Sequence, residues 1–525
     1  MKKIMSVLVI LLMTAALAFA GGGGDRTQSA ASGAPVKINV EIFDRGTDGG
    51  RSLAHDNAWT KWMHDKVLKD LNIDVTFVPV GRWSENTDII NLMASGSAPD
   101  LCYTYNSDMI ASFRDQGGIL DLAPYIDTLL PDLKKLLGAD PAISGKDFIY
   151  RNAIPGSGRI YSIPSYRVAL AQRNIFIRKD WLDKLGLPLP RTLQEFHDAL
   201  VAFRDRDPGN VGRNRVVPFF QGSDVRWGLA NFMNSSMTTG RSDRDRWVYS
   251  IAERNFMVPG YKEGVRLMNQ WYNENLIFHD FPLMTVADDG NNLLKSGVAG
   301  AFAGNWDLPY RTDSKILEDL RINVPGADFV PVDLNINNKD MMDKVGLQIF
   351  VPAFSRNKEA ALKYLNWLAK PENYQFLQVG NPGVNHEIVN GVPRTIGRPA
   401  GDPWFQNSDK NIDYTMPMNG VEMGSPELNS RVLALGYGDT PAQVIVNAYA
   451  VSTSNARAAA VFQSPPLSKG GMYAQTLQDK AEALLAQAIT CRPADFDRIY
   501  DAGYRDWLTS GAQEVFDERS AAYPR

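Results

Sequence analysis

The chain contains little cysteine and little histidine, with two cysteines and five histidines in 525 residues. Cys102 and Cys491 lie far apart in the sequence. A disulfide between them is possible in an oxidising compartment, but two buried thiols are the interpretation that we favour. The histidines are scattered and form no H-E-x-x-H pattern, which excludes that form of zinc site.

Two further catalytic signatures are absent. The sequence has no G-x-x-x-x-G-K-[ST] loop, which excludes a P-loop nucleotide site, and no G-x-S-x-G elbow. The paired carboxylates of a glycoside hydrolase have no fixed spacing in sequence. Because 59 acidic residues supply many chance pairs, the sequence leaves that class of enzyme open.

A strong excess of charge of one sign is also lacking. The formal net charge is −4 and no long basic run occurs, which argues against a nucleic-acid partner. The hydrophobic share of 44% and the charged share of 22% are ordinary for a soluble globular protein. A chain of 525 residues is long enough for two or three domains, or for two large lobes with substantial cores.

Residues 1–20 have the pattern of a secretory signal peptide. Two lysines near the start precede an apolar run at 4–17, and Ala-Phe-Ala at 18–20 fits an A-x-A cleavage site. Residues 21–35, GGGGDRTQSAASGAP, are expected to form a flexible tether. No later segment approaches the roughly 18 consecutive apolar residues of a membrane span, so we expect no transmembrane helix.

The segment after the tether alternates between strand and helix patterns. Residues 36–43, 73–80 and 101–105 are predicted strands, because they are rich in β-branched and aromatic residues. Residues 57–71 and 87–94 have helical periodicity. Strands that alternate with helices indicate βαβ units and a parallel sheet, and therefore an α/β fold class.

Residues 174–210 are the most informative stretch. The apolar run IFI predicts a buried strand, and the W-L-x-x-L spacing that follows predicts a short helix ended by Gly186. Thr192 and Glu195 form the pattern of a capping box, in which the hydroxyl accepts a backbone N–H and the carboxylate reaches back to the cap. A second amphipathic helix is predicted to begin there.

The same stretch carries a resemblance to a known family. Its pattern RKDWLDKLG, then P-x-T-x-x-E-F, then AFRDRDP resembles the long extracellular solute-binding proteins of carbohydrate-type ABC importers. Further segments match elements of that family in the same order, at residues 94–105, 117–127, 158–165, 346–391 and 494–523. Each motif is weak alone, but their order is specific, and together they span most of the chain after the tether.

The resemblance implies an α/β, two-lobed periplasmic-binding-protein fold with a hinge and an interlobe ligand cleft. Chains of this family cross between the lobes three times, and we expect the crossings near Pro164, Lys344 and Gly391. The expected lobe 1 is residues 36–164 plus 345–391, and the expected lobe 2 is residues 165–344 plus 392–525.

The resemblance also bears on anchoring. Many relatives carry a lipid-modified cysteine at the end of the signal peptide. Gly21 stands at that place here, with no cysteine nearby. A lipid anchor is therefore doubtful, and a free periplasmic or extracellular protein is the simpler expectation.

Several relatives carry a calcium loop, roughly D-P-N-G-N-G-x-x-D-E, after the AFRDRDP helix. Asp207 is present here, but Gly209 and Val211 stand where two oxygen ligands are expected. Arg215 and Val216 replace the later acidic residues. Calcium needs about six to eight oxygen ligands, so we expect no metal in this loop, and no cofactor is implied elsewhere.

Eleven tryptophans are the positive signal for a ligand. Four have the spacing of helical core residues and are expected to pack inside: Trp181, Trp271, Trp367 and Trp507. Sugar rings stack their C–H faces on aromatic rings while polar side chains hold the hydroxyls. The segment GNWDLPYR at 304–311 has this mixture, follows an apolar strand, and resembles the G-x-W site of maltose-type binding proteins. Trp306, Asp307 and Tyr310 are therefore candidate ligand contacts.

Other candidates follow predicted strands, because open α/β sheets bind ligands at the carboxyl ends of their strands. They are Asp44 and Arg45 after the first strand, Tyr105 and Asn106 after the third, and Tyr166 and Arg167 after the I-P element. Three more tryptophans lie beside glycine, proline, asparagine or aspartate, with interlobe packing as their alternative role: Trp83, Trp227 and Trp404.

We predict a periplasmic substrate-binding protein that captures a sugar, expected to be an oligosaccharide, and delivers it to ABC permease subunits. It is expected to be a monomer and to catalyse no reaction. The alternatives are a secreted carbohydrate-active enzyme and a ligand-sensing subunit that docks on a membrane receptor. The sequence does not identify the ligand, and a peptide is a further alternative to a neutral sugar. An acidic uronate oligomer would suit Arg45, Arg167 and Arg311 as carboxylate forks.

Overall fold

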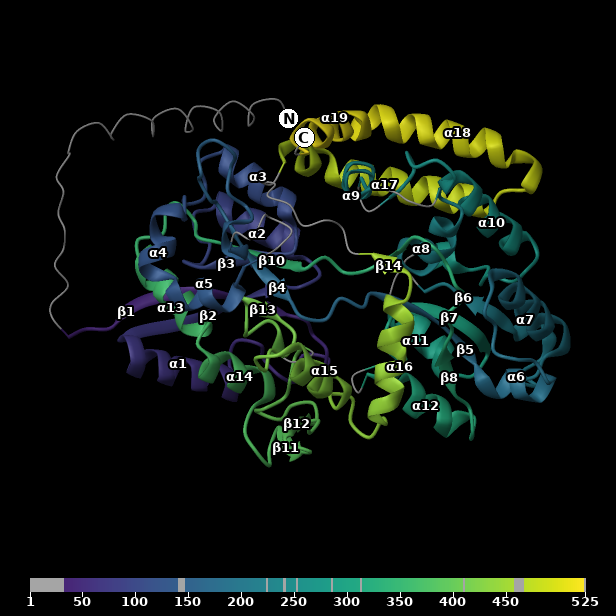
Figure 1. The fold of residues 1–525 in the computed structure, drawn as a ribbon, viewed down its shortest axis with the longest axis horizontal. Coiled ribbons are helices and arrows are strands. Elements are labelled where there is room, and N and C mark those ends of the chain that lie inside the picture. Colours follow the sequence, from purple (N-terminus) through teal and green to yellow (C-terminus); the bar gives the residue numbers. More distant parts are fainter. Residues whose placement is uncertain are drawn as a thin grey trace, which may run out of the picture.

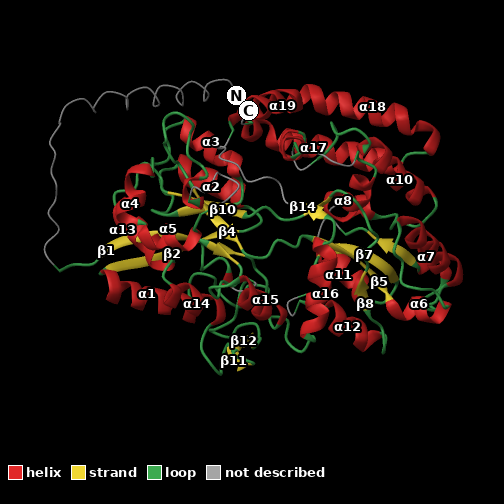
Figure 2. Cartoon of the chain, in the orientation of Figure 1, coloured by secondary structure: helices red, strands yellow, loops and turns green. Residues whose placement is uncertain are grey.

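The computed structural model describes residues 33–139, 147–222, 225–238, 242–251, 254–284, 287–311, 314–408, 411–457 and 467–523. The predicted signal peptide and most of the predicted tether lie outside these ranges. The described chain forms two α/β lobes that lie side by side (Figure 1), and in each lobe strands in the middle are surrounded by helices (Figure 2). Within these ranges no helix combines the length and apolar character that crossing a bilayer requires.

Lobe 1 is built on a run of six strands. The four strands bonded in one sheet are, in spatial order, β13 (Met418–Asn419), β4 (Ile163–Arg167), β10 (Val345–Phe350) and β3 (Cys102–Thr104). A parallel pair, β1 (Val36–Asp44) and β2 (Ile73–Gly81), continues it, because Glu41 N–H donates to Leu101 O and Leu101 N–H to Asn39 O. The three strands predicted near the N-terminus are therefore confirmed.

The helices of lobe 1 are α1 (Ala58–Leu71), α2 (Glu85–Ala94), α3 (Ser107–Asp115), α4 (Ile126–Leu129), α5 (Pro131–Leu137), α13 (Lys358–Leu368) and α14 (Pro371–Val379). The first begins at Asn57, whose side chain accepts from the N–H groups of Trp59 and Thr60. It ends at Asn72, which adopts a left-handed conformation with φ 54°. Trp59 is fully buried, as its helical spacing indicates.

Lobe 2 is built on a four-stranded sheet in the order β6 (Val217–Phe220), β7 (Ala299–Asn305), β5 (Arg173–Arg178), β8 (Phe329–Pro331). Successive residues of β5 face opposite sides, so Ile175 and Ile177 join one hydrophobic cluster and Phe176 joins another. Its helices include α6 (Lys179–Leu185), α7 (Leu193–Arg206), α8 (Val225–Ser235), α9 (Asp243–Val248), α10 (Tyr261–Asn273), α11 (Ala287–Lys295), α12 (Ile316–Asn323) and α16 (Ala442–Thr453).

The stretch 174–210 folds as predicted into β5, α6 and α7. Gly186 ends α6 in a left-handed conformation, and Thr192 caps α7 by accepting from Glu195 N–H at 3.1 Å. The capping box differs in one detail. The Glu195 carboxylate accepts from Arg191 N–H at 2.7 Å, one residue before the cap, rather than from the cap residue itself.

The sheets are mixed, which corrects the predicted parallel sheet. β1 and β2 are parallel, but β10 runs antiparallel to both β3 and β4, and β5 runs antiparallel to both β7 and β8. Local patterns indicate a strand but not its direction, and β10 returns to lobe 1 only after the chain has built most of lobe 2.

Two passages between the lobes lie near the expected positions. Lobe 1 strand β4 ends at Arg167 and lobe 2 strand β5 begins at Arg173, so the first passage is residues 168–172. The chain returns between β9 (Lys339–Asp340), which pairs with β14 (Ala456–Arg457), and β10, which begins at Val345.

The third passage is not at Gly391, and residues 392–408 and 411–421 belong with lobe 1 rather than lobe 2. Tyr414 and Met416 are buried in the lobe 1 core, and β13 pairs with β4. The passage lies instead at α15 (Pro426–Ala434), where Val432 packs beside Val392 and the next residue, Leu433, packs against a lobe 2 cluster. A hairpin of β11 (His386–Val389) and β12 (Val392–Thr395) projects before it.

The last helices bridge the lobes, which further corrects the predicted boundary. They are α17 (Ser468–Thr490), α18 (Phe496–Trp507) and α19 (Gln513–Ala522), drawn in yellow along the top of Figure 1. Leu477 and Leu484 of α17 lie in the lobe 2 core. At its other end, Gly470 and Gly471 approach Asp108 of α3 so closely that no larger side chain would fit without a shift.

Cys102 and Cys491 are both free thiols, and they lie in the hydrophobic clusters of different lobes. The interpretation without a disulfide is confirmed. Cys102 is buried, whereas Cys491 is only partly buried.

Candidate functional site

A cavity of about 1730 Å³ lies between the lobes. It is lined by lobe 1 strand ends, by lobe 2 strand ends and helices, and by all three passages. Pockets for drug-sized ligands are typically about 300–1,000 Å³, so this cleft has room for an elongated ligand.

The lobe 1 wall is formed at the ends of strands. Its lining side chains include Arg45, Arg82, Trp83, Tyr105, Tyr166, Arg167, Asn407 and Asn419. Arg45 follows β1, Arg82 follows β2 and Tyr105 follows β3. These three strands run in the same direction, so their carboxyl ends meet at one edge of the sheet.

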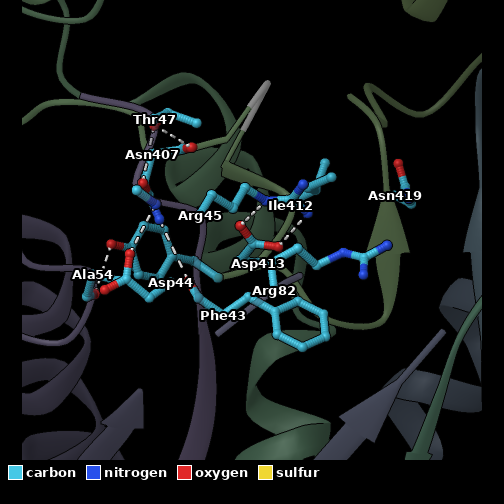
Figure 3. Close-up of polar contacts among 12 residues, drawn as sticks. Phe43, Asp44, Arg45, Thr47, Ala54, Arg82, Asn407, Ile412, Asp413 and Asn419 are labelled. Atoms are coloured by element: carbon cyan, nitrogen blue, oxygen red, sulfur yellow. Dashed lines mark hydrogen bonds and ion pairs between the residues drawn. The ribbon is translucent and has the colours of Figure 1, made fainter. Parts of the chain in front are cut away.

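Arg45 is held by an ion pair that joins distant parts of lobe 1 (Figure 3). Its Nε lies 2.7 Å from Asp413 Oδ2 and its Nη2 lies 2.8 Å from Asp413 Oδ1. Burial by itself lowers the pKa of Arg45, but the neighbouring Asp413 carboxylate outweighs it and raises the pKa above its ordinary value. Thr47 Oγ1 also donates to the backbone oxygen of Asn407 at 3.0 Å, so Asn407 and Asp413 are both fastened to the end of β1.

Arg82 stacks on the aromatic part of the same wall. Its guanidinium lies 4.3 Å from the ring centre of Tyr105, 5.4 Å from that of Phe43 and 5.1 Å from that of Trp83. Its Nη1 donates to Glu85 Oε2 at 2.9 Å. Glu85 also accepts from Tyr105 N–H at 3.0 Å, and therefore connects the ends of β2 and β3. Burial raises the pKa of the Glu85 carboxyl.

Tyr166 and Arg167 end β4 where the chain leaves lobe 1. The Tyr166 ring meets Phe148 edge-on at 5.5 Å, and its N–H donates to Pro417 O. Arg167 Nη1 donates to the backbone oxygen of Asp343 at 3.4 Å, which links the first and second passages. Burial lowers the pKa of Arg167.

The lobe 2 wall is made of the edges of core side chains. Trp306 lines the cleft but is only 6% exposed, because Tyr449 and Tyr437 meet it edge-on at 5.3 and 5.9 Å. Asp307 accepts from Arg311 Nε at 2.9 Å and from Tyr437 Oη at 2.9 Å. The lobe 2 wall is therefore held by packing and by one buried carboxylate.

Trp227, at the start of α8, is the more accessible aromatic of this wall. Its Nε1 donates to Asn305 Oδ1 at 3.1 Å, and the Arg173 guanidinium lies 4.3 Å from its ring centre. Across the cleft, Trp83 is 78% exposed at the rim. One ring is oriented by its neighbours and the other is open to solvent.

The structure brings seven of the ten predicted site residues to the cleft: Arg45, Trp83, Tyr105, Tyr166, Trp227, Trp306 and Asp307. The other three lie elsewhere. Tyr310 is buried against Phe176 in the lobe 2 core, and burial raises its pKa. Trp404 meets Trp59 edge-on at 4.9 Å, which is packing within lobe 1. Asp44 Oδ1 accepts from Gly46 N–H at 3.0 Å and shapes the turn after β1.

Sequence reasoning missed most of the uncharged polar lining. Gln221, Asn291, Asn305, Asn407 and Asn419 face the cleft from both lobes. Asn305 and Gln221 follow the apolar runs of β7 and β6, so the rule of polar residues at strand ends could have found them. Asn407 and Asn419 follow no predicted strand, and their segment was expected in lobe 2 rather than in lobe 1.

The loop that resembles a calcium site is closed by its own backbone. Asp207 Oδ1 accepts from Val211 N–H at 3.0 Å, and Oδ2 accepts from Gly212 N–H at 2.8 Å. Its carboxylate is thus occupied where relatives are expected to bind a cation. Among the residues that the structure describes, no cluster of three histidine, cysteine or acidic side chains is arranged to hold a metal.

Sequence comparison matches the chain to the family model described as bacterial extracellular solute-binding protein, over residues 54–375. The chain is 26% identical to lipoprotein LipO of Bacillus subtilis strain 168 over 399 residues, which is 73% of this chain and 74% of LipO. It is 27% identical to the polygalacturonan/rhamnogalacturonan-binding protein YtcQ of the same strain, over 63% of this chain and 64% of YtcQ.

Comparison of structures gives matches along almost the whole chain. The alginate-binding protein AlgQ2, in a crystal structure without calcium ion, matches with a TM-score of 0.64 and 19% identity, over 94% of this chain and 99% of that one. FusA of Streptococcus pneumoniae, in complex with kestose, matches with a TM-score of 0.62 and 14% identity, over 92% and 98%. At these identities the likeness establishes the two-lobed α/β fold.

Proposed function

Since the chain belongs to the family of bacterial extracellular solute-binding proteins, we propose that it captures an oligosaccharide in the interlobe cleft and delivers it to the permease of an ABC importer. The family consists of binding proteins, so the alternative of a secreted enzyme is set aside.

The observation that carries the oligosaccharide proposal is the size and make-up of the cleft. A volume of about 1730 Å³ exceeds what a single sugar ring needs. Trp83, Tyr105 and Trp227 offer aromatic surface, and amides such as Asn305 and Asn419 offer both donors and acceptors for hydroxyl groups. The names of YtcQ and of FusA, a fructooligosaccharide ABC transporter substrate-binding protein, support the same class of ligand.

Export completes the proposal. The predicted signal peptide at 1–20 would direct the chain out of the cytoplasm. The binding proteins of this family work outside the cytoplasm, as their description as extracellular states. LipO is named a lipoprotein, whereas Gly21 follows the predicted cleavage site here. We expect a monomer without a lipid anchor. Fractionation of cells followed by detergent extraction tests the second point: recovery only in the detergent phase would establish an anchor.

Thermal unfolding of the mature chain, from residue 21, against a panel of mono- and oligosaccharides tests the function. A ligand at about 100 times its Kd should add roughly 2.7 kcal/mol to the free energy of unfolding. We expect a higher midpoint with one class of oligosaccharide, and the sugar should be recovered chemically unchanged. No shift across the panel would contradict the proposal.

A pair of variants locates the site. Trp83→Ala removes an exposed ring at the rim of the cleft, and Leu283→Ala removes a side chain that is 77% exposed and not part of the cleft lining. Both should melt like the parent protein without sugar, because neither side chain is buried. Only Trp83→Ala should reduce the ligand-induced shift, and equal shifts in the two variants would place the ligand elsewhere.

A further inference from the structure

Three arginines of lobe 1 converge on one side of the cleft around Tyr105. Arg45, Arg82 and Arg167 all line the cavity, from the ends of β1, β2 and β4. Arg82 stacks on the Tyr105 ring at 4.3 Å. Asn419 stands opposite Arg167 in the β13–β4 pairing and donates to Tyr105 Oη at 3.4 Å. Residues far apart in the chain thus place three guanidinium groups on one patch.

Two of the three positive charges are balanced within the protein. Arg45 makes the two-pronged ion pair with Asp413, whose side chain is only 3% exposed. Arg82 pairs with the largely buried Glu85. Their carboxylate partners hold these groups in place, so they shape the patch and carry little uncompensated charge.

Arg167 is different. Its side chain donates a single long hydrogen bond, to the backbone oxygen of Asp343. In the part of the chain covered by the structure, no carboxylate oxygen forms an ion pair with it. Its side chain is half-buried and lines the cleft beside the first passage. A guanidinium has five N–H donors, so most of its hydrogen-bonding capacity is available to a ligand.

The carboxylates of the cleft, in contrast, already have partners. Asp307 binds Arg311 and Tyr437. Glu422 accepts from Gly424 N–H at 2.7 Å and from Asn429 Nδ2 at 2.9 Å. Asp343 also lines the cleft, and its carboxylate accepts from Val345 N–H at 3.0 Å. Among the described residues of the cleft, Arg167 is therefore the arginine without an ion-pair partner, and each carboxylate accepts at least one hydrogen bond within the protein.

We infer that the ligand is an acidic oligosaccharide, in which the carboxylate of one uronate ring pairs with Arg167 while other rings lie along the aromatic and amide lining. Guanidinium and carboxylate match in plane and in spacing, and a ligand carboxylate offsets the cost of a half-buried cation. This inference rests on the proposed function and names its class of ligand.

The test compares sugars that differ only in the carboxyl group. Calorimetry on the mature chain measures Kd for trigalacturonate and for α-1,4-linked galactotriose, and for trimannuronate and β-1,4-linked mannotriose. We expect at least one acid to bind, about tenfold or more tighter than its neutral counterpart. Arg167→Gln should abolish that preference, and Arg167→Lys should restore part of it.

A control separates the arginine from general effects of charge. Arg191 is exposed and lies away from the cleft, so Arg191→Gln removes the same charge without touching the cavity. It should leave the preference unchanged. Since Arg167→Gln gives up only one long hydrogen bond, we expect the variant to fold, and its melting curve checks this.

The outcomes distinguish the two proposals. Equal or tighter binding of the neutral sugars overturns the acidic ligand and leaves the sugar-binding function intact. An acid preference that survives Arg167→Gln overturns the assignment to Arg167. Failure of every sugar, acidic or neutral, to bind overturns the proposed function together with this inference.

Discussion

The two walls of the cleft are held by different interactions, ion pairs on the lobe 1 wall and hydrophobic packing on the lobe 2 wall. On the lobe 1 wall, ion pairs hold polar side chains at strand ends, as in Arg45–Asp413 and Arg82–Glu85. On the lobe 2 wall, Trp306 presents the edge of a hydrophobic cluster. The comparison shows that a residue can line a cleft and still be mainly a core residue. Ligand selection is then expected from lobe 1, and a firm backing surface from lobe 2.

The largest effect is expected where the lobe 2 wall is core. Trp306→Ala should lower the free energy of unfolding by about 3–5 kcal/mol, because it leaves a large cavity beside Tyr437 and Tyr449. Urea unfolding followed by circular dichroism measures this. Trp83→Ala is the control and should stay within about 0.5 kcal/mol of the parent. A Trp306→Ala protein of parental stability would break the comparison.

The next effect tests the ion pair of the lobe 1 wall. Arg45→Gln should cost about 3 kcal/mol, because it leaves the Asp413 carboxylate buried without its partner. Removing both charges with Arg45→Gln plus Asp413→Asn should cost less than the single change. If the double variant is instead as unstable as the sum of the two single variants, the pair does not hold this wall.

A smaller effect compares the two accessible tryptophans. Trp227→Phe keeps a ring but loses the hydrogen bond to Asn305, at a cost of about 1 kcal/mol. Trp83→Phe exchanges one exposed ring for another and should change stability by less than about 0.5 kcal/mol. Urea unfolding of both variants measures the difference, and equal costs would mean that Trp227 is not oriented by this bond.

The smallest effect is a pH dependence in lobe 1. His64 contacts Asp65 at 3.0 Å and Asp74 at 3.2 Å, and the hydrogen bond to Asp65, followed by that to Asp74, raises the pKa of His64 above its ordinary value. The charged form therefore stabilises the folded state fully below about pH 6.5, and this contribution is lost as the pH rises through the raised pKa.

The His64 site is partly exposed, so the effect should be only a few tenths of a kcal/mol. Unfolding of the parent and of His64→Gln at pH 6 and pH 8 measures it. The parent should lose slightly more stability between these values than the variant does. An equal loss in both proteins would mean that the contacts of His64 with Asp65 and Asp74 do not stabilise lobe 1.

The strand and helix segments were largely predictable, because local pattern and capping decide them. The segment at 174–210 and the strand at 36–44 folded where periodicity placed them. Strand direction and lobe membership were not predictable, since they depend on which strand, distant in the sequence, a segment pairs with. The predicted lobe boundary at Gly391 was wrong for this reason, because β13 pairs with β4 of lobe 1.

The residues of the candidate site were predictable or not for the same reasons. Arg45 and Tyr105 were found because the carboxyl ends of parallel strands meet in space. Tyr310 and Trp404 were misplaced because an aromatic residue in a loop can face either a cleft or a core, and nothing local distinguishes the two. Asn419 was missed because its side chain reaches the cleft only through the β13–β4 pairing.

The sequence by itself determined the α/β class, most local elements and the family, since these depend on short-range periodicity and on ordered motifs. Only the tertiary structure decided which charged groups are paired with a group of opposite charge. Arg45 lies just after β1 and Arg167 at the end of β4, but Asp413 pairs with the first and no carboxylate pairs with the second in the described chain. Charge pairing acts over a few ångströms in space, and sequence separation does not encode that distance.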